Sequence, residues 1–412
     1  MSILKLIWNY LTARKLNTIL NVLLLSLGIS IVTILILFKN QLGEKIASTS
    51  KGIDLVVGAK GSPLQLILCS VFHIDFPTGN IKLSDAEKLA KHRLVKSAIP
   101  LALGDSYKGY RIVGTNRQYV NLYSAELATG AWWSNDLEVT IGSVVASMTK
   151  MKVGDMFESA HGLTKDGHAH EENKYVVTGI LKSAGTVIDN LILTNVGSIW
   201  KVHEEPASDS LVAAKLLTPS GLVPTVEAGD SLREITSLLI KYKNPIAAIQ
   251  LPRIINTQTN MQAASPAFET ARLFTLLGIG IEALMGFAYV LIVISGLSIF
   301  IALYNSLKER RYDLAIMRSM GASRSLLFRA VVLEGSILTF MGATIGMVLG
   351  HLLLGIFILV IGEGQKIGLT TFVFYSEEMI VLGGSIFLGV ICSLIPAIEA
   401  YRTDIHKVLA GN

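Results

Sequence analysis

Three of the eight histidines lie in one short segment, at positions 161, 168 and 170, and Glu171 follows the last of them. Imidazole and carboxylate groups together are suitable ligands for zinc, nickel or copper. In an extended strand, His168 and His170 project to the same face. The segment His161, His168, His170 and Glu171 is therefore a candidate metal site, with zinc as the first candidate ion. The alternative is a polar loop between two strands that binds no metal.

A second group of reactive side chains lies in the segment from Lys308 to Arg324, between two long apolar stretches. Its charged residues can make charge-assisted hydrogen bonds with another protein. A solvated loop would explain the arginines alone, but it would not explain the apolar residues between them, which favour a partner groove. The charged residues are Arg310, Arg311, Asp313 and Arg318, and the apolar ones are Leu314, Ile316, Met317 and Met320.

No sequence motif of a common catalytic site is present. G-x-S-x-G, H-E-x-x-H and Walker A motifs are absent, and the turn Gly58-Ala-Lys-Gly61 lacks the spacing of a phosphate-binding loop. The two cysteines, Cys69 and Cys392, cannot form a disulfide framework, and we expect Cys69 to be a buried apolar residue. We therefore predict no catalytic residue and no directly bound cofactor. If ATP drives this protein, another polypeptide is expected to hydrolyse it.

The composition is that of a membrane protein. Hydrophobic residues make up 51% of the 412 residues and charged residues only 16%, and the mean hydropathy is +0.53. The net charge of +5 could indicate nucleic acid binding, but the basic residues cluster beside apolar stretches instead. Nucleic acid is therefore not an expected partner.

Four apolar stretches are long enough to cross about 30 Å of hydrocarbon. The first contains no charge and has no cleavage site after it, so we predict a retained span rather than a signal peptide. The second would measure about 48 Å as a helix, so either it continues outward as a stalk or the span begins near Ala283. The predicted stretches are Thr18–Phe38, Leu273–Tyr304, Ala330–Ile361 and Met379–Ile398.

Lysine and arginine flank the first stretch on its N-terminal side, fill the 308–324 segment and occur in the tail. The positive-inside rule then predicts that both termini and this segment lie in the cytoplasm and that residues 39–272 lie outside. We expect the membrane to be the inner membrane of a cell. The amphipathic N-terminal segment is predicted to lie on the inner leaflet, although a plain helical extension of the first span fits as well.

The full predicted organisation follows from these boundaries. It comprises an interfacial helix (1–17), a first span (18–38), an outside α+β domain (39–272) with a strand-rich insertion at about 116–206, a stalk and second span (273–304), a cytoplasmic coupling segment (305–329), a third span (330–361), a short outer loop (362–378), a fourth span (379–401) and a tail (402–412).

Within the outside domain, five apolar runs predict strands, at 54–57, 110–113, 138–141, 174–177 and 190–193. A capping box at Ser84 predicts a helix to about His92. We further predict a helix over Ser231–Tyr242 and a short strand over Ile246–Leu251 after Pro245.

The third span contains three notable features. Gly342, Gly346 and Gly350 repeat every four residues and predict a tightly packed face, either within one subunit or across a dimer. Glu334 is expected to pair with an arginine such as Arg329, or to cap the packing near the interface. His351 is expected to be neutral and hydrogen-bonded.

The 308–324 segment resembles the R-x-x-E-I-G-x-x-R-A-x-G-A-x motif of the MacB/FtsX-like permease family of ABC transporters. Asp313 stands at the glutamate, Ala315 at the glycine, Arg318 at the arginine and Gly321-Ala322 at the G-A pair. The aspartate and alanine depart from the motif. Outside, the runs Gly130–Trp133, Val139–Ser143, Lys152–Asp155 and Val177–Lys182, with Gly185, Thr186 and Asp189, resemble the same family's domain.

The resemblance implies a fold with four transmembrane helices and a MacB-like periplasmic core domain. It implies a permease dimer, more often of identical subunits, in which each subunit contacts an ABC ATPase that binds ATP and magnesium. A periplasmic adaptor or substrate-binding protein is a further expected partner. The substrate would be a lipoprotein, a peptide or a small lipophilic molecule; the alternatives are a regulator of a periplasmic hydrolase or sensor, and metal-linked export.

The coupling residues are predicted around a chain break at Gly321, which would precede a short helix over Ser323–Arg329. The predicted ATPase-coupling set is Arg310, Arg311, Asp313, Arg318, Gly321, Ala322, Ser323, Arg324 and Phe328.

Overall fold

The computed structural model describes residues 3–161, 169–203, 233–361 and 369–402. Its internal contacts divide the chain into two compact units. One contains residues 1–43, 276–365 and 369–412, and the other contains residues 44–275 and 366–368. The first unit is helical, whereas the second is built on a β-sheet.

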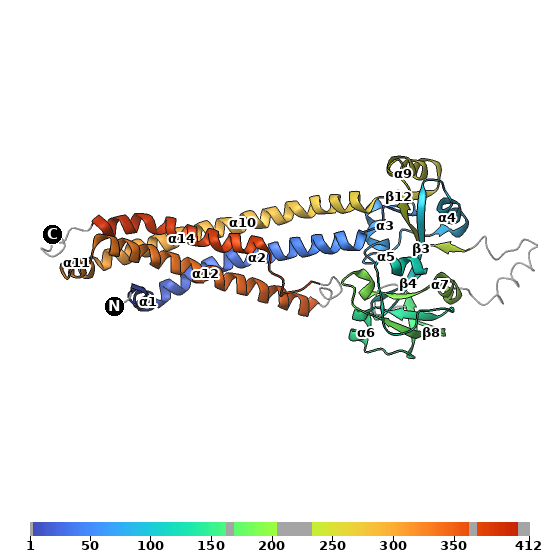
Figure 1. The fold of residues 1–412 in the computed structure, drawn as a ribbon, viewed down its shortest axis with the longest axis horizontal. Coiled ribbons are helices and arrows are strands. Elements are labelled where there is room, and N and C mark those ends of the chain that lie inside the picture. The colour runs from blue at the N-terminus through green and yellow to red at the C-terminus, as the bar shows by residue number, and fades with distance from the viewer. Residues whose placement is uncertain (1–2, 162–168, 204–232, 362–368, 403–412) are drawn as a thin grey trace, which may run out of the picture. The chain divides into compact units, whose positions relative to one another are not determined.

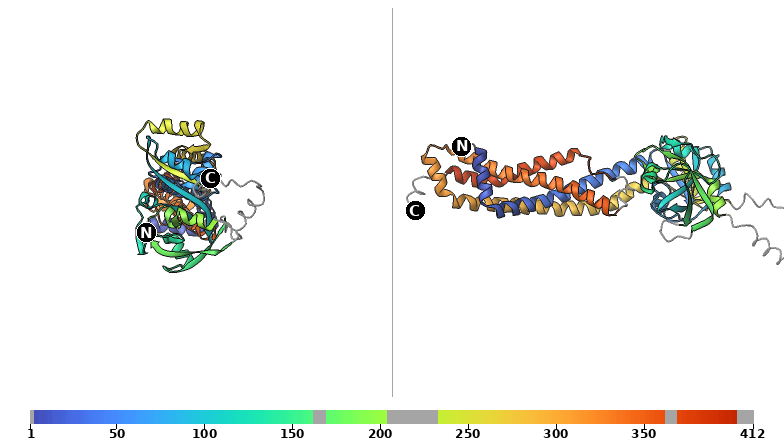
Figure 2. Two further views of the ribbon diagram at one scale, coloured as in Figure 1. Left: turned by 90° about the vertical axis from the view of Figure 1, so that its right-hand side faces the viewer. Right: turned by 90° about the horizontal axis from the view of Figure 1, so that it is seen from below.

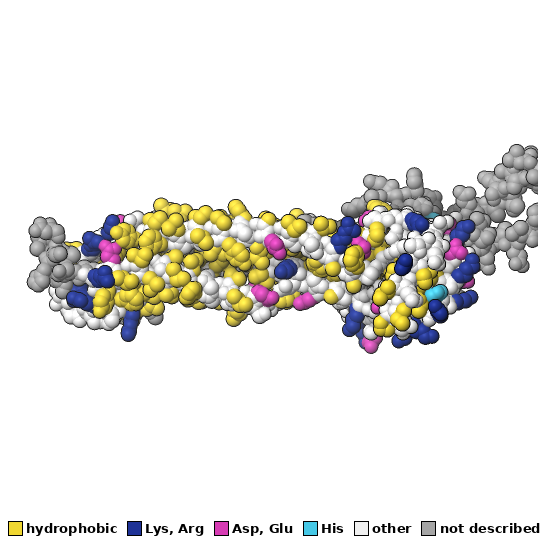
Figure 3. All heavy atoms as spheres, turned by 90° about the horizontal axis from the view of Figure 1, so that it is seen from above, with side chains coloured by type: hydrophobic (Ala, Val, Ile, Leu, Met, Phe, Trp, Pro, Cys, Tyr) yellow, Lys and Arg dark blue, Asp and Glu magenta, His cyan; other side chains and the backbone are white. Residues whose placement is uncertain are grey.

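Four long helices contain the predicted spans. They are α2 (Lys15–Ser50), α10 (Pro266–Glu309), α12 (Arg324–Ile361) and α14 (Ser376–Arg402) (Figure 1). Each contains an 18-residue window with a mean hydropathy between 2.3 and 2.6, so each predicted stretch lies in a helix that is long and apolar enough to cross a membrane. Figure 3 shows a broad hydrophobic band along this unit, with charged side chains gathered at the end that carries α11 (Arg311–Ser319).

The structure decides one alternative that the sequence left open and contradicts one prediction. Helix α10 is continuous over 44 residues, so the second span does continue as a helix on its N-terminal side. The predicted short helix over Ser323–Arg329 is wrong, because these residues form the start of the 38-residue helix α12. Ser323 caps it, with its hydroxyl accepting a hydrogen bond from the Leu326 N–H at 3.2 Å.

The glycines of α12 allow two other helices to approach closely. A Cβ atom added at Gly346 would lie 2.7 Å from the Ser26 carbonyl oxygen of α2, and one at Gly350 would lie 2.8 Å from Thr33 Cβ. The predicted small-residue face is therefore used within the subunit. Gly335 lies on another side of α12, where an added Cβ would come 2.9 Å from the Gly389 carbonyl oxygen of α14.

Helix α1 (Ile3–Ala13) crosses the helical unit steeply with respect to α2 (Figure 2). Ile7 and Leu11 are buried against Leu25, Leu303 and Leu338, whereas Trp8 is 56% exposed. The predicted amphipathic pattern is therefore present, with one apolar stripe packed on the unit and Trp8 on the outer side. Placement of this helix on the inner leaflet stays a prediction.

The second unit is an α+β domain, as predicted. Its ten-stranded sheet has the order β12-β1-β11-β3-β4-β9-β6-β8-β5, with β7 beside β3 and β8, and β10 and β2 form a separate pair. The strands are β1 (Leu55–Ala59), β2 (Ile81–Lys82), β3 (Val95–Tyr107), β4 (Tyr110–Thr115), β5 (Leu127–Gly130), β6 (Glu138–Ile141), β7 (Met156–His161), β8 (Ala169–Leu181), β9 (Ile192–Asn195), β10 (Glu234–Ile235), β11 (Ser237–Tyr242) and β12 (Met261–Ala264).

Short helices cover this sheet, and strand β3 connects its two parts. β3 pairs with β11 through residues 95–101 and with β4 from Ala102 onward. The strands of the expected insertion therefore continue the same sheet. The helices are α3 (Pro63–Ser70), α4 (Leu83–Ala90), α5 (Arg117–Leu122), α6 (Ser143–Thr149), the 3-10 helix η1 (Val187–Asn190), α7 (Val196–His203) and α9 (Ala247–Gln258).

The five predicted strands correspond to β1, β4, β6, β8 and β9, except that Asn190 ends η1. The helix predicted over Ser231–Tyr242 is wrong in the part that the structure describes, which forms β10 and β11. Leu238 and Ile240 enter one hydrophobic core and Leu239 enters another, so β11 is buried on both faces. A continuous apolar run of this kind is typical of an interior strand.

Two predictions based on helix boundaries are also wrong. Residues 247–251 of the strand predicted over Ile246–Leu251 belong to α9, and just before its start the Asn244 side-chain oxygen accepts a hydrogen bond from the Ala247 N–H at 3.0 Å. Asn244-Pro245 is thus a helix start signal rather than a helix stop. The helix predicted from Ser84 is confirmed as α4, but its capping box does not form, because α4 begins at Leu83 and its capping residue Lys82 makes no side-chain capping bond.

A buried polar group lies inside the core next to α3. His73 is 6% exposed, and its Nε2 lies 2.8 Å from the hydroxyl oxygen of Tyr119. Burial, and then the charge of Arg111, lower the pKa of His73 to about 3. Cys69 is fully buried, as predicted, and burial raises the pKa of its thiol to about 11, so it is not a nucleophile at neutral pH.

We expect His73 to make this unit less stable in mild acid. The unfolded chain takes up the histidine proton below about pH 6.5, whereas the folded chain resists it until about pH 3. The free energy of unfolding should therefore fall by about 2 kcal/mol between pH 7 and pH 5. Urea unfolding of the full chain in detergent, followed by tryptophan fluorescence, measures this. An equal loss in His73→Gln would contradict the assignment to His73.

Candidate coupling site

Helix α11 is positioned by a specific helix end. Gly321 has a φ of +101°, its N–H donates to the Arg318 carbonyl oxygen at 3.1 Å, and the Ala322 N–H donates to the Met317 carbonyl oxygen at 3.0 Å. This pair of bonds is a Schellman motif, which needs a residue at positive φ and therefore favours glycine. Gly321 ends α11 as predicted and lets the chain turn directly into α12.

The inner face of α11 is fixed to the helical unit. Leu314 is 7% exposed and Ala315 is fully buried. Leu314 belongs to a hydrophobic cluster with Leu307 of α10, Leu327 and Val331 of α12, and Ala397 and Ala400 of α14. Tight packing of this kind makes α11 move together with three long helices.

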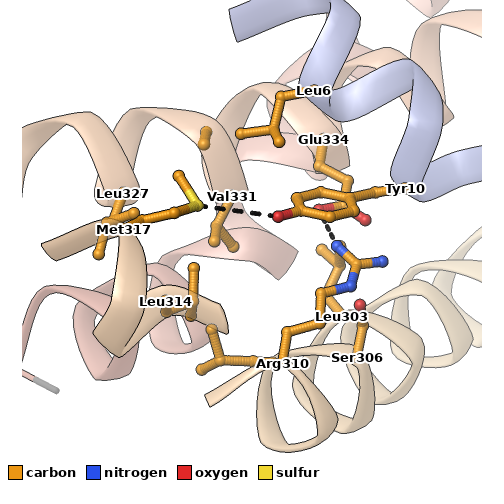
Figure 4. A pocket seen from close by; sticks show the side chains of 12 residues that line it. Leu6, Tyr10, Leu303, Ser306, Arg310, Leu314, Met317, Leu327, Val331 and Glu334 are labelled. Atoms are coloured by element: carbon orange, nitrogen blue, oxygen red, sulfur yellow. Dashed lines mark hydrogen bonds and ion pairs between the residues drawn. The ribbon is translucent and has the colours of Figure 1, made fainter. Parts of the chain in front are cut away.

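An ion pair between α12 and the chain just after α10 lies beside this cluster. Arg310 Nη1 is 3.5 Å from Glu334 Oε2, and the two side chains are only 13% and 10% exposed. The Cζ atom of Arg310 lies 3.8 Å from the ring centre of Tyr10 on α1, and the Tyr10 hydroxyl donates to Met317 Sδ at 3.9 Å (Figure 4). These contacts join α1, α11 and α12 around one small pocket.

Two further ion pairs join the helix ends in the same region. Arg14, just after α1, pairs with Glu309 at the end of α10. Arg311, at the start of α11, pairs with Glu399 of α14. Charged side chains therefore tie α11 and its neighbours together, in addition to the apolar cluster.

The outer face of α11 combines apolar and charged side chains. Tyr312 is 59% exposed, Ile316 is 37% exposed and Met320 is 82% exposed, and Asp313 is exposed beside them. We call this set, Tyr312, Asp313, Ile316 and Met320, the outer face. Nearby, Nε and Nη1 of Arg318 are buried and have no hydrogen-bond partner among the described residues.

The structure separates the predicted coupling residues into two groups. Arg310, Arg311 and Phe328 are engaged within the subunit, and Leu314 and Met317 also pack inward. Asp313, Ser323 and Arg324 are exposed, and Gly321 and Ala322 form the turn. The expectation that all four apolar residues face a partner is therefore wrong for Leu314 and Met317, because they complete the core of their own subunit.

Sequence reasoning missed Tyr10, Arg14 and Glu399, and it named Arg329 instead of Arg310 as the example of a partner for Glu334. Tyr10 lies about 300 residues before Arg310 along the chain, and no spacing pattern in the sequence connects the two positions. The only available signal was the amphipathic stripe of α1, which predicts that one face of this helix packs but does not identify its partner.

The candidate metal site includes residues at the ends of two paired strands. His168 falls outside the described residues. His161 ends β7, and His170 and Glu171 lie at the start of β8, two strands that pair with each other. Among the described residues, no group of three or more His, Cys, Asp or Glu side chains forms a cluster suitable for a metal. Zinc binding by this segment stays a prediction.

Comparison with known proteins assigns most of the chain to two family models. Residues 18–236 match the MacB-like periplasmic core domain, and residues 285–405 match the FtsX-like permease C-terminal domain. An uncharacterized ABC transporter permease of Methanocaldococcus jannaschii is 23% identical over 64% of this chain and 58% of its own length. The macrolide export ATP-binding/permease protein MacB of Rhodopirellula baltica is 20% identical over 76% of this chain and 47% of its own length.

The chain thus spans about half the length of the curated relatives it matches. Among solved structures, the periplasmic region of MacB from Actinobacillus actinomycetemcomitans matches 56% of this chain with 12% identity and a TM-score of 0.34. That match covers 97% of the solved chain. The extracellular domain of the ABC-type transporter YknZ from Gram-positive bacteria matches 52% of this chain and 99% of its own, with 12% identity and a TM-score of 0.28.

Proposed function

Because this chain belongs to the MacB/FtsX-like permease family of ABC transporters, we propose that it converts ATP-driven closure of a separate ABC ATPase into motion of its outside domain. ATP and magnesium would bind to the ATPase, and the permease itself would carry no catalytic residue. Each permease subunit would contact one ATPase subunit at α11, in the inner membrane, with both chain termini in the cytoplasm.

The division of α11 into two faces is the observation that carries this proposal. Its inner face packs against α10, α12 and α14, so a force on α11 reaches three long helices at once. Its outer face has large apolar side chains in an otherwise charged surface. Arg318 adds a guanidinium group with two buried nitrogen atoms that lack an acceptor among the described residues. A carboxylate of the ATPase would pair with this guanidinium once its side chain turns outward, since buried charges are normally paired.

The cargo is proposed to be a lipoprotein, a peptide or a small lipophilic molecule taken from the periplasmic side. The relative in Rhodopirellula baltica is named for macrolide export, which is consistent with a lipophilic small molecule. The permease would act as a dimer, with identical subunits as the first expectation, and with a periplasmic adaptor or substrate-binding protein as a further partner.

A regulator of a periplasmic hydrolase or sensor would use the same coupling site. The two functions differ in what stimulates the ATPase of the purified complex. A lipophilic or peptide substrate should stimulate it if the chain is a transporter, whereas an outside protein partner should stimulate it if the chain is a regulator. Metal-linked export through His161, His168, His170 and Glu171 is the weaker alternative.

The coupling proposal predicts the effects of substitutions on the outer face of α11 and at the neighbouring Arg318. Met320→Asp and Arg318→Glu should each reduce ATPase stimulation at least tenfold, because a charged residue would replace an apolar contact or oppose a partner carboxylate. The measurement is ATP hydrolysis by the permease reconstituted with its ATPase in nanodiscs.

Glu377→Gln provides a matched control, because this exposed carboxylate lies in the first turn of α14, at the other end of the helical unit. It should leave stimulation unchanged. Arg310 is unsuitable for charge reversal, since its guanidinium is held inside the subunit by Glu334. Normal stimulation in both Met320→Asp and Arg318→Glu would reject α11 as the coupling site.

A further inference from the structure

A buried histidine and a buried glutamate meet at the end of α12 opposite α11. His351 Nε2 lies 2.9 Å from Glu378 Oε2, and the two side chains are 12% and 1% exposed. On the other side of the ring, His351 Nδ1 lies 2.7 Å from the carbonyl oxygen of Thr371. Ionisable side chains in such a position are costly, so they usually have a function.

The carbonyl of Thr371 determines which nitrogen of His351 carries hydrogen. A carbonyl oxygen can only accept, so Nδ1 must be protonated and donate. If the ring is neutral, Nε2 is then an acceptor and Glu378 must hold a proton to donate to it. If the ring is charged, Nε2 donates to the carboxylate. In either case one proton lies between His351 Nε2 and Glu378 Oε2. Without this proton, the lone pair of Nε2 would face the negatively charged carboxylate of Glu378, and the two groups could not form a hydrogen bond.

This pair holds the chain segment 369–375, which precedes α14. Thr371 is held by His351, and the Tyr375 N–H donates to Glu378 Oε1 at 3.0 Å. The ring of Phe374 lies with its centre 4.5 Å from that of His351. The neighbouring Phe372 is 91% exposed. Release of the pair would therefore free a segment that presents two large aromatic side chains.

The same segment is also tied to α2, but by groups that do not titrate. Gln41 Nε2 donates to the Thr370 carbonyl oxygen at 2.8 Å, and the Thr370 N–H donates to Gln41 Oε1 at 2.8 Å. Leu369 packs with Leu37, Leu354 and Ile358. The other described titratable or charged groups within four residues of these contacts along the chain are Lys39, Glu44 and Lys45 on α2, Tyr375 in the segment and Glu377 on α14. The polar contacts described above connect the pair to backbone atoms of Thr371 and Tyr375.

We propose that His351 and Glu378 form a proton-binding site that clamps the segment 369–375 onto α12. While the shared proton is bound, Thr371 and Tyr375 are held. When the proton leaves to water, the hydrogen bond between the two side chains is lost. Residues 371–375, with Phe372 and Phe374, are then released, while Gln41 still holds Thr370. This device is separate from the coupling site at α11 and does not depend on the proposed transport function.

The proposal gives a quantitative pH dependence. An imidazole open to water is neutral above about pH 6.5. Above that pH, opening of the clamp releases one proton, so the equilibrium constant for opening should rise about tenfold per pH unit. Between about pH 4.5 and 6.5, the opened pair holds the same number of protons as the closed pair, so opening should not depend on pH.

The Thr370 N–H donates to Gln41, so its amide serves as an internal reference that should not depend on the clamp. The test is amide hydrogen exchange of the full chain in nanodiscs, measured from pH 5 to pH 9 for Tyr375, whose N–H donates to Glu378. Protection factors, which are corrected for the intrinsic pH dependence of exchange, should stay constant up to about pH 6.5 and then fall about tenfold per pH unit. A wild-type chain without this fall would overturn the proposal.

Glu378→Gln separates the shared proton from other causes. The glutamine amide can donate to Nε2 of neutral His351, and its oxygen can accept from the Tyr375 N–H. Above about pH 6.5 an opened imidazole is neutral as well, so opening of this variant releases no proton. Its protection should therefore stay constant from about pH 6.5 to pH 9. Glu377→Gln, a change in the adjacent exposed carboxylate, should behave as wild type. A fall of equal slope in Glu378→Gln would assign the pH dependence to other groups and refute the site.

Discussion

Replacement of Gly346 by leucine is expected to prevent normal assembly of the helical unit. A Cβ at this position already lies 2.7 Å from the Ser26 carbonyl oxygen and 3.0 Å from Ser26 Cα. Both atoms belong to the backbone of α2, so no side chain can rotate away, and α12 must move outward. Alanine should cost about 1–3 kcal/mol, and leucine more than that. Thermal inactivation in detergent and the yield of monodisperse protein measure the effect.

Gly384 is the matched control for this experiment. It lies inside α14, and an added Cβ there would meet no atom within 4 Å. Gly384→Ala should be neutral or should stabilise the unit by up to about 1 kcal/mol, since alanine favours a helix more than glycine does. If Gly346→Ala were as well tolerated as Gly384→Ala, the close contact between α12 and α2 would be wrong.

Glu334→Met is expected to destabilise the end of the unit that carries α11 by about 3–5 kcal/mol, because Arg310 would keep a charge with no carboxylate beside it. The guanidinium is held between Glu334 and the ring of Tyr10 and has little access to water. Arg310→Met should destabilise this end of the unit by a similar amount, because Glu334 would then keep a buried negative charge without the guanidinium of Arg310 beside it. Thermal unfolding in detergent, with amide exchange in α11, measures both.

The double variant Arg310→Met, Glu334→Met is the decisive control. It removes both charges and leaves apolar side chains next to Leu303, Leu314 and Val331, which line the same pocket. Replacement of a complete buried pair by apolar residues is often neutral or stabilising. Most of the loss in the single variants should therefore be recovered. Simple addition of the two single effects would mean that the two groups do not interact.

Local patterns explain why the membrane helices and several strands could be predicted. A transmembrane helix must satisfy all its backbone hydrogen bonds within itself and expose apolar side chains along about 20 residues, so its signal is contained in one stretch. The end of α11 at Gly321 was predicted for a similar reason, since only glycine readily adopts the φ of +101° found there.

The errors arose where neighbouring elements decide the structure. Residues 237–242 form a strand because β11 lies between β1 and β3 and is buried on both faces. Residues 246–251 were assigned to a strand because Pro245 was taken as a stop, although the Asn244 side chain accepts a hydrogen bond at the start of the helix that follows. The start of α12 was taken as a separate helix, because a turn and a span were expected to have a boundary between them.

For the candidate sites, the sequence by itself determined residue types and their approximate location. It placed arginines, a carboxylate and apolar side chains in one short segment, put Glu334 and His351 in an apolar helix, and predicted a close-packed glycine face. These properties depend on composition and helical spacing, which are local quantities.

Only the tertiary structure decided which groups meet. It joined Arg310 to Glu334 and Tyr10, turned Leu314 inward while leaving Met320 exposed, and placed Glu378 and the Thr371 carbonyl on opposite sides of His351. The partners come from helices far apart in the chain, and their pairing follows from how these helices pack. Helix packing depends on the complementary shapes of all the faces at once, so no single segment contains that information.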